Sequence, residues 1–285
     1  MIRRTGRSAL SLLLTVFVIS PAWLQAQTAP GRAVDETKLA QILQKTADYC
    51  RKLENAVLDF VCLEEVKETF NYEVVERESD RGFYRVIDRP VDNTFLYEYQ
   101  LIRNANKTEE SRTLIERNGK RCHEKTSGVG TLRFLFEKII YGPVDLLRLP
   151  NQPRFDYAIV KEEAKPAGRE VIIEAVPKPG EQEYLPFGKI WVRESDFAIV
   201  KIDYDRRSIR SLYEESQEGW EKNGKARFEL TSEFDVERNG IRFPSRLVFL
   251  EADVHKSGQA SVRCQAVITY KDYRFFTVIV NVEYN

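Results

Sequence analysis

The alternation of apolar and polar residues is clearest in the stretch Phe187–Asp205, where it predicts two strands joined by a tight turn. Ile190 and Val192 share one face of the first strand, while Trp191 alternates with charged residues on the other face. Residues two apart lie on the same side of a strand. The segment therefore predicts an antiparallel hairpin with one buried face.

A different period, of three and four residues, predicts an amphipathic helix from about Glu36 to Leu53. A strand over Asp59–Phe70 follows, although the apolar residues at its start could also continue the helix. The apolar stripe of the helix consists of Leu39, Ile42, Leu43, Thr46, Tyr49, Cys50 and Leu53.

Strand patterns with short connections fill most of the remaining chain, and we expect about ten strands. Asn118-Gly119 and Asn239-Gly240 are strong signals for two-residue hairpin turns. No linker or internal repeat divides the pattern. The sequence predicts one α+β domain over residues 27–285, built on a large curved antiparallel sheet that covers the N-terminal helix and an inserted helical segment.

The inserted segment lies between residues 128 and 150, where helical spacing interrupts the strand rhythm. Glycines precede it, and Gly142-Pro143 ends its first part. Two interpretations remain open at this point. The segment is either a helix that fills a core or a lid over a hydrophobic cavity, for which the glycines would supply hinges.

The N-terminus has the features of an export signal. Arg3, Arg4 and Arg7 precede an apolar run over Ala9–Ile19 that is too short for a membrane span. We expect cleavage after residue 26 and a periplasmic or secreted product. The whole chain has 44 basic and 44 acidic residues, and removal of three arginines leaves a slight acidic excess. This balance gives no reason to expect nucleic acid as a partner.

The four cysteines all follow the expected cleavage site. An even number in an exported protein favours disulfides, although four cysteines allow three pairings. We expect Cys50–Cys62 and Cys122–Cys264. With only two histidines and no CxxC motif, a zinc site is a weaker alternative, and we expect no metal and no cofactor.

No established catalytic motif is present, so the sequence predicts a protein that is not an enzyme. Adjacent acidic pairs such as Glu64-Glu65 and Glu162-Glu163 point to opposite faces of a strand, and they do not converge on one substrate. Several strands are apolar on both faces, as in residues 171–173 and 247–250. Such runs indicate either strands covered on both sides or a partly closed barrel with an apolar lumen.

The order of these elements resembles the outer-membrane lipoprotein-sorting superfamily, the LolA-like and RseB-like proteins. The resemblance rests on four stretches: LDFVCLEEVKETF, GKIWVRESDFAIVKIDYD, NGIRFPSRLVFLE and YKDYRFFTVIV. It implies an incomplete β-barrel whose apolar cavity holds a lipid or a lipoprotein acyl chain, with the protein acting as a carrier or a sensor. A monomer is expected. The residues expected to line the cavity are Leu135, Phe136, Ile139, Trp191, Phe243 and Phe249.

A second hypothesis assigns the chain a different role. It would be an envelope protein with a filled core and no ligand, which binds a protein partner through a sheet edge or through the charged segment 206–225.

Overall fold

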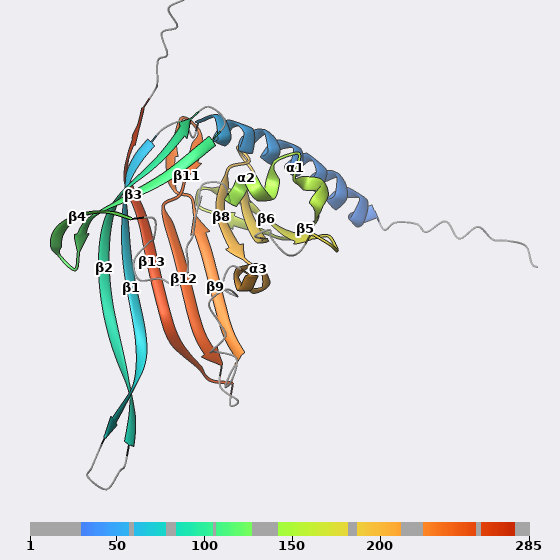
Figure 1. Cartoon of the computed structure of the whole chain (residues 1–285). Helices are drawn as coiled ribbons and strands as arrows, with labels where there is room; N and C mark the ends of the chain where they lie inside the picture. The colour runs from blue at the N-terminus through green and yellow to red at the C-terminus, as the bar shows by residue number, and fades with distance from the viewer. Residues whose placement is uncertain are drawn as a thin grey trace, which may run out of the picture.

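The computed structural model describes residues 30–56, 60–77, 84–104, 107–126, 142–181, 187–211, 225–254 and 258–276. Eleven strands form one antiparallel sheet in the order β4-β3-β2-β1-β13-β12-β9-β8-β7-β6-β5. The edge strands β4 and β5 are not paired with each other within the described residues, so the curved sheet is an unclosed barrel (Figure 1). The predicted fold class is confirmed.

The bounds of the elements follow from the hydrogen-bonding pattern. The strands of the large sheet are β1 (Phe60–Arg77), β2 (Tyr84–Asn104), β3 (Lys107–Arg117), β4 (Lys120–Thr126), β5 (Phe155–Lys165), β6 (Gly168–Pro177), β7 (Gly188–Arg193), β8 (Ile199–Tyr204), β9 (Lys225–Glu233), β12 (Arg246–Val254) and β13 (Ala260–Phe275). A separate two-stranded sheet contains β10 (Val236–Arg238) and β11 (Ile241–Phe243). The helices are α1 (Pro30–Ala56), α2 (Gly142–Leu147), α3 (Arg206–Ser211) and the 3-10 turn η2 (Gln152–Arg154).

The hairpin predicted at Phe187–Asp205 forms as β7 and β8, with Ile190 and Val192 buried. Gly188 is required where β7 meets β8, because a Cβ atom there would overlap the backbone carbonyl of Asp203. The predicted helix also forms, but it begins earlier, at Pro30. Proline is well suited to a first helical turn because its missing N–H would have no partner there.

The sequence pattern predicts one strand over Phe228–Glu237 and one over Ile241–Asp253, and each of them is divided in two. The first is interrupted between β9 and β10, and the second between β11 and β12 at Pro244-Ser245. Proline has no N–H to donate to a strand ladder. The short β10–β11 hairpin leaves the large sheet at these breaks and turns at Asn239-Gly240, where both residues have positive φ angles. The Asn-Gly prediction of a hairpin turn is confirmed here and at Asn118-Gly119 between β3 and β4.

Helices α1 and α2 are attached to one end of the sheet. α1 contacts α2, β5 and β11, and α2 contacts β8. The Gln152 side-chain amide donates to the carbonyls of Leu43 in α1 and Leu147 in α2, at 2.9 and 2.8 Å. The Lys38 ammonium in α1 lies 2.7 Å from Glu162 of β5 and 3.0 Å from Glu194 of the β7–β8 turn. These contacts hold the helices over strands β5 to β8 (Figure 1).

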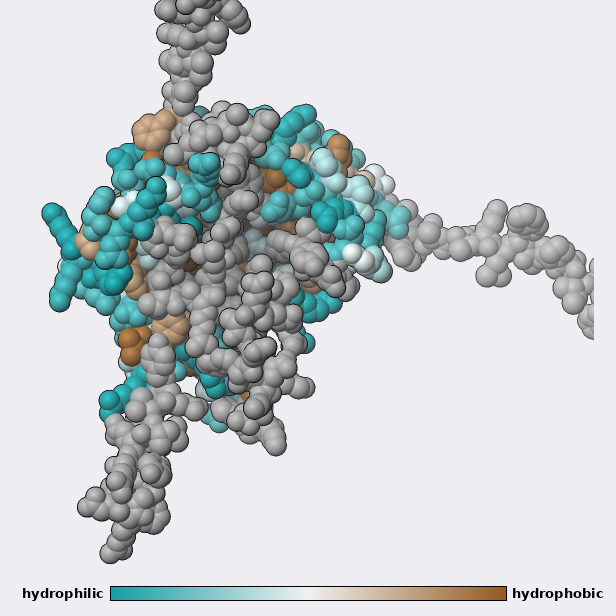
Figure 2. Space-filling view, in the orientation of Figure 1, coloured by the Kyte–Doolittle hydropathy of each residue, from teal (hydrophilic) through white to brown (hydrophobic). Residues whose placement is uncertain are grey.

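The opposite end of the sheet extends as a two-stranded ribbon. Residues 71–77 of β1 pair only with residues 84–90 of β2, because the pairing of β1 with β13 ends at Phe70. The ribbon projects away from the remaining sheet in Figure 1. Hydrophilic residues dominate the described surface seen in Figure 2, with small hydrophobic patches between them. Within the described residues, no helix is both long and apolar enough to cross a membrane.

Candidate functional site: the inner face of the sheet

One face of the large sheet is buried across nearly its whole width, from β3 near one edge to β5 at the other edge, and we call it the inner face. Cross-strand pairing places Glu64 of β1 beside Tyr97 of β2 and Tyr270 of β13. The same alternation continues through the other strands. We divide this face into the apolar half, formed by β5 to β8, and the charged half, formed by β1, β2, β3 and β13.

The apolar half has an ordinary hydrophobic core. Val171, Ile173, Ile190 and Ile202 are at most 1% exposed, and no charged residue of β5 to β8 is buried in the described structure. The Tyr157 hydroxyl of β5 donates to the carbonyl of Leu146 in α2. The contacts in this half fix the helices on the sheet and leave no charged group beneath them.

The charged half buries a salt bridge on the same face. Glu64 is fully buried and Arg112 is 3% exposed. The guanidinium of Arg112 donates to both carboxylate oxygens of Glu64, at 2.7 and 3.3 Å, and the Tyr270 hydroxyl donates to the same carboxylate at 2.9 Å. Such a bidentate pair is among the stronger hydrogen-bonded arrangements in proteins.

A second carboxylate extends this group. The Tyr99 hydroxyl donates to Glu110 at 2.6 Å, and the guanidinium of Arg112 lies 4.8 Å from the centre of the Tyr99 ring. We call these five residues, Glu64, Tyr99, Glu110, Arg112 and Tyr270, the buried ion-pair cluster. It contains two carboxylates and one guanidinium, with the hydroxyls of two tyrosines donating to the carboxylates.

The cluster affects the pKa values of its own members. Burial raises the pKa of Tyr99 and the pKa of Tyr270 well above the usual range for tyrosine. Burial alone would lower the pKa of Arg112, but the Glu64 carboxylate and its hydrogen bonds outweigh burial and raise it. Arg112 therefore stays charged, and its charge is balanced inside the sheet.

Aromatic rings lie beside the cluster, at the start of β1. The Phe60 ring is 5.2 Å from Tyr273 and 5.9 Å from Phe275, and Phe243 of β11 lies 4.8 Å from Phe275. Tyr99 belongs to both groups, since its ring is 5.7 Å from Phe60. The β10–β11 hairpin thus packs its Phe243 against the inner face at this end.

The inner face becomes exposed at the other end of the same strands. Val66 is fully buried, Phe70 is partly buried, and Val91, which pairs with Phe70, is 42% exposed. Val262, two residues before the buried Cys264 in β13, is 38% exposed. We call Phe70, Val91 and Val262 the apolar rim. Between Val66 and the rim, the same face holds the buried Glu68, which accepts a hydrogen bond from Asn93 of β2, so polar side chains separate the apolar rim from the core.

The residues predicted to line a cavity have separate locations. Phe249 is fully buried on β12, and Phe243 is 1% exposed in the aromatic group. Trp191 does not face the core, because it lies on the opposite face of β7 with the Lys201 ammonium 4.5 Å from its ring centre. Leu135, Phe136 and Ile139 lie outside the described residues.

The predicted disulfides are not formed, because none of the four cysteines is joined to another in the structure. Cys122 in β4 and Cys264 in β13 are four strand spacings apart in the sheet order. At about 4.8 Å per spacing this separation far exceeds the ~7 Å limit for the Cα atoms of a disulfide. The Cys50 thiol donates to the Pro143 carbonyl at 3.4 Å, and burial raises its pKa.

The buried ion-pair cluster was not predicted from the sequence, although part of the signal is present there. The period of two in β1 places Glu64 on the same face as Cys62 and Val66. No group of three or more His, Cys, Asp or Glu residues that could hold a metal occurs in the described part of the chain.

Comparison with known proteins finds similar solved structures at low sequence identity. No family model matches the chain, and no curated protein matches it. Among solved structures, it is similar to an outer-membrane lipoprotein-sorting protein domain from Vibrio parahaemolyticus, with 11% identity, a TM-score of 0.35, and coverage of 84% of this chain and 95% of that one.

Two further solved structures are also similar to this chain. A LolA superfamily protein from Nitrosomonas europaea has 13% identity and a TM-score of 0.33, with coverage of 84% of this chain and 94% of that one. MucB in complex with MucA(peri) has 11% identity and a TM-score of 0.23, with coverage of 84% and 99%. The matched structures include the superfamily that the sequence resembles. At these values they carry no argument about function, which we base on the geometry of the inner face.

Proposed function

We propose that this chain is an exported envelope protein that binds a lipid or a lipoprotein acyl chain on the inner face of its sheet, as a carrier or a sensor and not as an enzyme. The observation that carries the proposal is the apolar rim. Val91 and Val262 are exposed valines at the end of the buried face, beyond Glu68 and Asn93, and they offer apolar surface to a ligand.

The energetics favour an acyl chain as the ligand. Each buried methylene group contributes about 0.8 kcal/mol before the costs of association. The exposed side chains of Val91 and Val262 offer such an apolar contact to an alkyl chain at the rim. The export signal expected over residues 1–26 would deliver the protein to a compartment that contains lipoproteins.

The proposal can be tested by titration with a fluorescent fatty acid. Val91→Asp and Val262→Asp place a charge on the apolar rim, and because both positions are exposed we expect the fold to be retained. The double variant should bind the probe at least about tenfold more weakly, a change of ~1.4 kcal/mol. Val160→Asp is a matched control, since Val160 is an exposed valine, 43% accessible, on the edge strand β5. Equal binding by the rim variant and the control would contradict the proposal.

A protein partner is the alternative function, and the β1–β2 ribbon favours it. The ribbon has no third strand within the described residues, so its edges offer backbone groups for strand addition. Purification of the protein from its host envelope separates the two functions. Bound lipid that is lost in the rim variant supports the first. A stoichiometric protein partner without lipid, lost when the ribbon is replaced by a two-residue turn, supports the second.

A further inference from the structure

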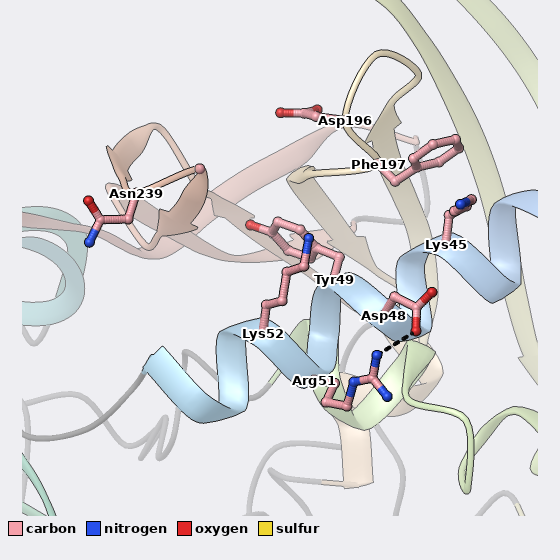
Figure 3. A pocket seen from close by; sticks show the side chains of 9 residues that line it. Lys45, Asp48, Tyr49, Arg51, Lys52, Asp196, Phe197 and Asn239 are labelled. Carbon is pink, nitrogen blue, oxygen red and sulfur yellow. Dashed lines mark hydrogen bonds and ion pairs between the residues drawn. The ribbon is translucent and has the colours of Figure 1, made fainter.

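A groove lies away from the inner face, where α1 meets two turns of the sheet. Its volume is about 530 Å³, which is within the range of small-molecule sites. One wall is α1, with Lys45, Tyr49 and Lys52, and the other walls are the β7–β8 turn and the β10–β11 turn. In Figure 3, Tyr49 and Lys52 lie on the side of the helix that faces the two turns.

The carboxylates around the groove already have cationic partners. Asp48 accepts a hydrogen bond from Arg51 at 3.0 Å. Asp196 forms a bidentate pair with Arg193 and accepts the N–H of Ala198 at 3.2 Å. The hydrogen bonds from Arg193 lower the pKa of Asp196, so that this carboxylate is ionised and neutralised by its partner at neutral pH.

Two cations in the groove have no such partner. Lys45 and Lys52 both line it, and neither has a hydrogen bond or an ion pair in the structure as described. The carboxylates next to them are occupied by Arg51 and Arg193. The groove thus carries an excess of positive charge that no described residue balances.

A third donor lies between them. The Tyr49 hydroxyl accepts the backbone N–H of Arg242 at 2.9 Å, and it donates its own hydrogen to no group among the described residues. Tyr49 is 5% exposed, and burial raises its pKa to about 12. It therefore keeps its proton and can act as a donor throughout the neutral range.

The walls of the groove are held in fixed positions. The Phe197 N–H donates to the Arg193 carbonyl at 2.8 Å, which closes the β7–β8 turn. Arg193 and Arg242 both contact the carboxylate of Glu237, at 3.6 and 3.4 Å, and this joins the β10–β11 hairpin to that turn. A ligand would enter a site whose backbone is already arranged, which lowers the cost of binding.

We propose that this groove binds a small anionic ligand through a phosphate or carboxylate group, with Lys45 and Lys52 as the cations and the Tyr49 hydroxyl as a donor. The rings of Tyr49 and Phe197 supply apolar contact for the remainder of the ligand. The site does not depend on the acyl-chain function, because none of its lining residues belongs to the inner-face cluster or the rim.

In the test, the full mature protein is titrated with inorganic phosphate, and binding is followed by the NMR chemical shifts of the backbone amides. Saturable shifts at the amides of Phe197 and Gly240 are the expected result. Lys45→Gln/Lys52→Gln should weaken binding about tenfold or more, because it removes two charge-assisted contacts. Tyr49→Phe retains the ring and should weaken binding by a smaller factor.

A matched control removes the same charge elsewhere. Lys120→Gln/Lys125→Gln alters two exposed lysines of β4, at the far edge of the sheet, and should leave phosphate binding unchanged within about twofold if the groove is the site. An equal loss in both double variants, or no saturable shift at Phe197 and Gly240, would overturn the proposal.

A further experiment distinguishes a soluble anion from a lipid headgroup as the ligand. Binding of glycerol phosphate is compared with binding of phosphatidylglycerol vesicles and of phosphatidylcholine vesicles. Binding of glycerol phosphate alone indicates a soluble ligand, while binding of phosphatidylglycerol vesicles that requires Lys45 and Lys52 indicates a lipid headgroup. Either result supports the anion site, and vesicle binding that survives in the Lys45/Lys52 variant contradicts it.

Discussion

Strands β5 to β8 and strands β1 to β3 contribute to the same face of one sheet, yet they bury different side chains. In the apolar half, α1 contacts β5 and α2 contacts β8, aliphatic residues such as Ile173 and Ile190 are buried, and no charged side chain of these strands is buried in the described structure. In the charged half, Glu64 and Arg112 are buried at the same depth as the aliphatic residues beside them.

The difference is informative because a buried ion pair seldom adds stability. Desolvation of two charges costs several kcal/mol per ion, and apolar residues of the same volume are often as stable or more stable. The apolar half is organised as a structural core. The charged half combines a buried ion pair with an apolar rim, which is why we assign ligand binding to it.

The contrast between the apolar half and the charged half can first be tested at the buried ion pair, where the largest effect on stability is expected. Arg112→Met leaves Glu64 buried without its partner, and we expect a loss of about 3–5 kcal/mol in the free energy of unfolding. Urea denaturation at neutral pH measures this loss.

A triple variant is the control for that measurement. Glu64→Leu/Arg112→Met/Tyr270→Phe removes the Glu64–Arg112 ion pair together with the hydroxyl that donates to Glu64. It should recover most of the lost stability, because replacing both partners of a buried pair by apolar groups can be nearly neutral. If Arg112→Met cost less than about 1 kcal/mol, Glu64 would have access to water and the contrast between the halves would be lost.

The apolar half is tested by Ile190→Ala. Ile190 is fully buried, and its truncation should cost about 3 kcal/mol through lost burial and the cavity left behind. The stability lost in Arg112→Met should be recovered by removing the partner side chains, whereas no second substitution of that kind should restore the stability lost in Ile190→Ala. Val160→Ala, at an exposed position, should change stability by less than about 0.5 kcal/mol. A similarly small effect for Ile190→Ala would show that this half is not closely packed.

Sequence patterns predicted the elements well where one period dominates. The period of two identified the β7–β8 hairpin with its buried Ile190 and Val192, and the helical stripe identified α1. The same pattern placed Trp191 among charged residues on the outer face, so its assignment to a cavity disagreed with the pattern itself. Strand breaks depended on single residues such as Pro244, whose missing N–H was visible in the sequence.

The order of strands in the sheet could not be predicted from these local patterns. Arg112 is 48 residues from Glu64, and the two meet only because β2 lies between β1 and β3 in a particular register. The predicted Cys122–Cys264 bridge failed for the same reason, since four strand spacings separate the two cysteines. Local periodicity shows which side of a strand a residue occupies, but not which distant residue it will face.

Alkaline pH offers the third and smallest test, at the helix that covers the apolar half. Burial raises the pKa of Tyr49 to about 12, from about 10 in an unfolded chain. Above pH 10 the unfolded state loses this proton while the folded state keeps it, so stability falls as pH rises. The contribution of Tyr49 is fully present below pH 10, and roughly 2–3 kcal/mol is lost between pH 10 and pH 12.

The experiment compares urea unfolding of the wild type and Tyr49→Phe from pH 9 to pH 12. The variant should lose less stability over this range, because phenylalanine has no proton to release. Tyr99 and Tyr270 of the charged half remain in the variant, and their pKa values are also raised by burial. An unchanged slope in Tyr49→Phe would contradict the assignment and would attribute the alkaline loss to other buried tyrosines, whose pKa values are also raised. A reduced slope would instead show that the contact between α1 and the β10–β11 hairpin loosens as its tyrosine ionises.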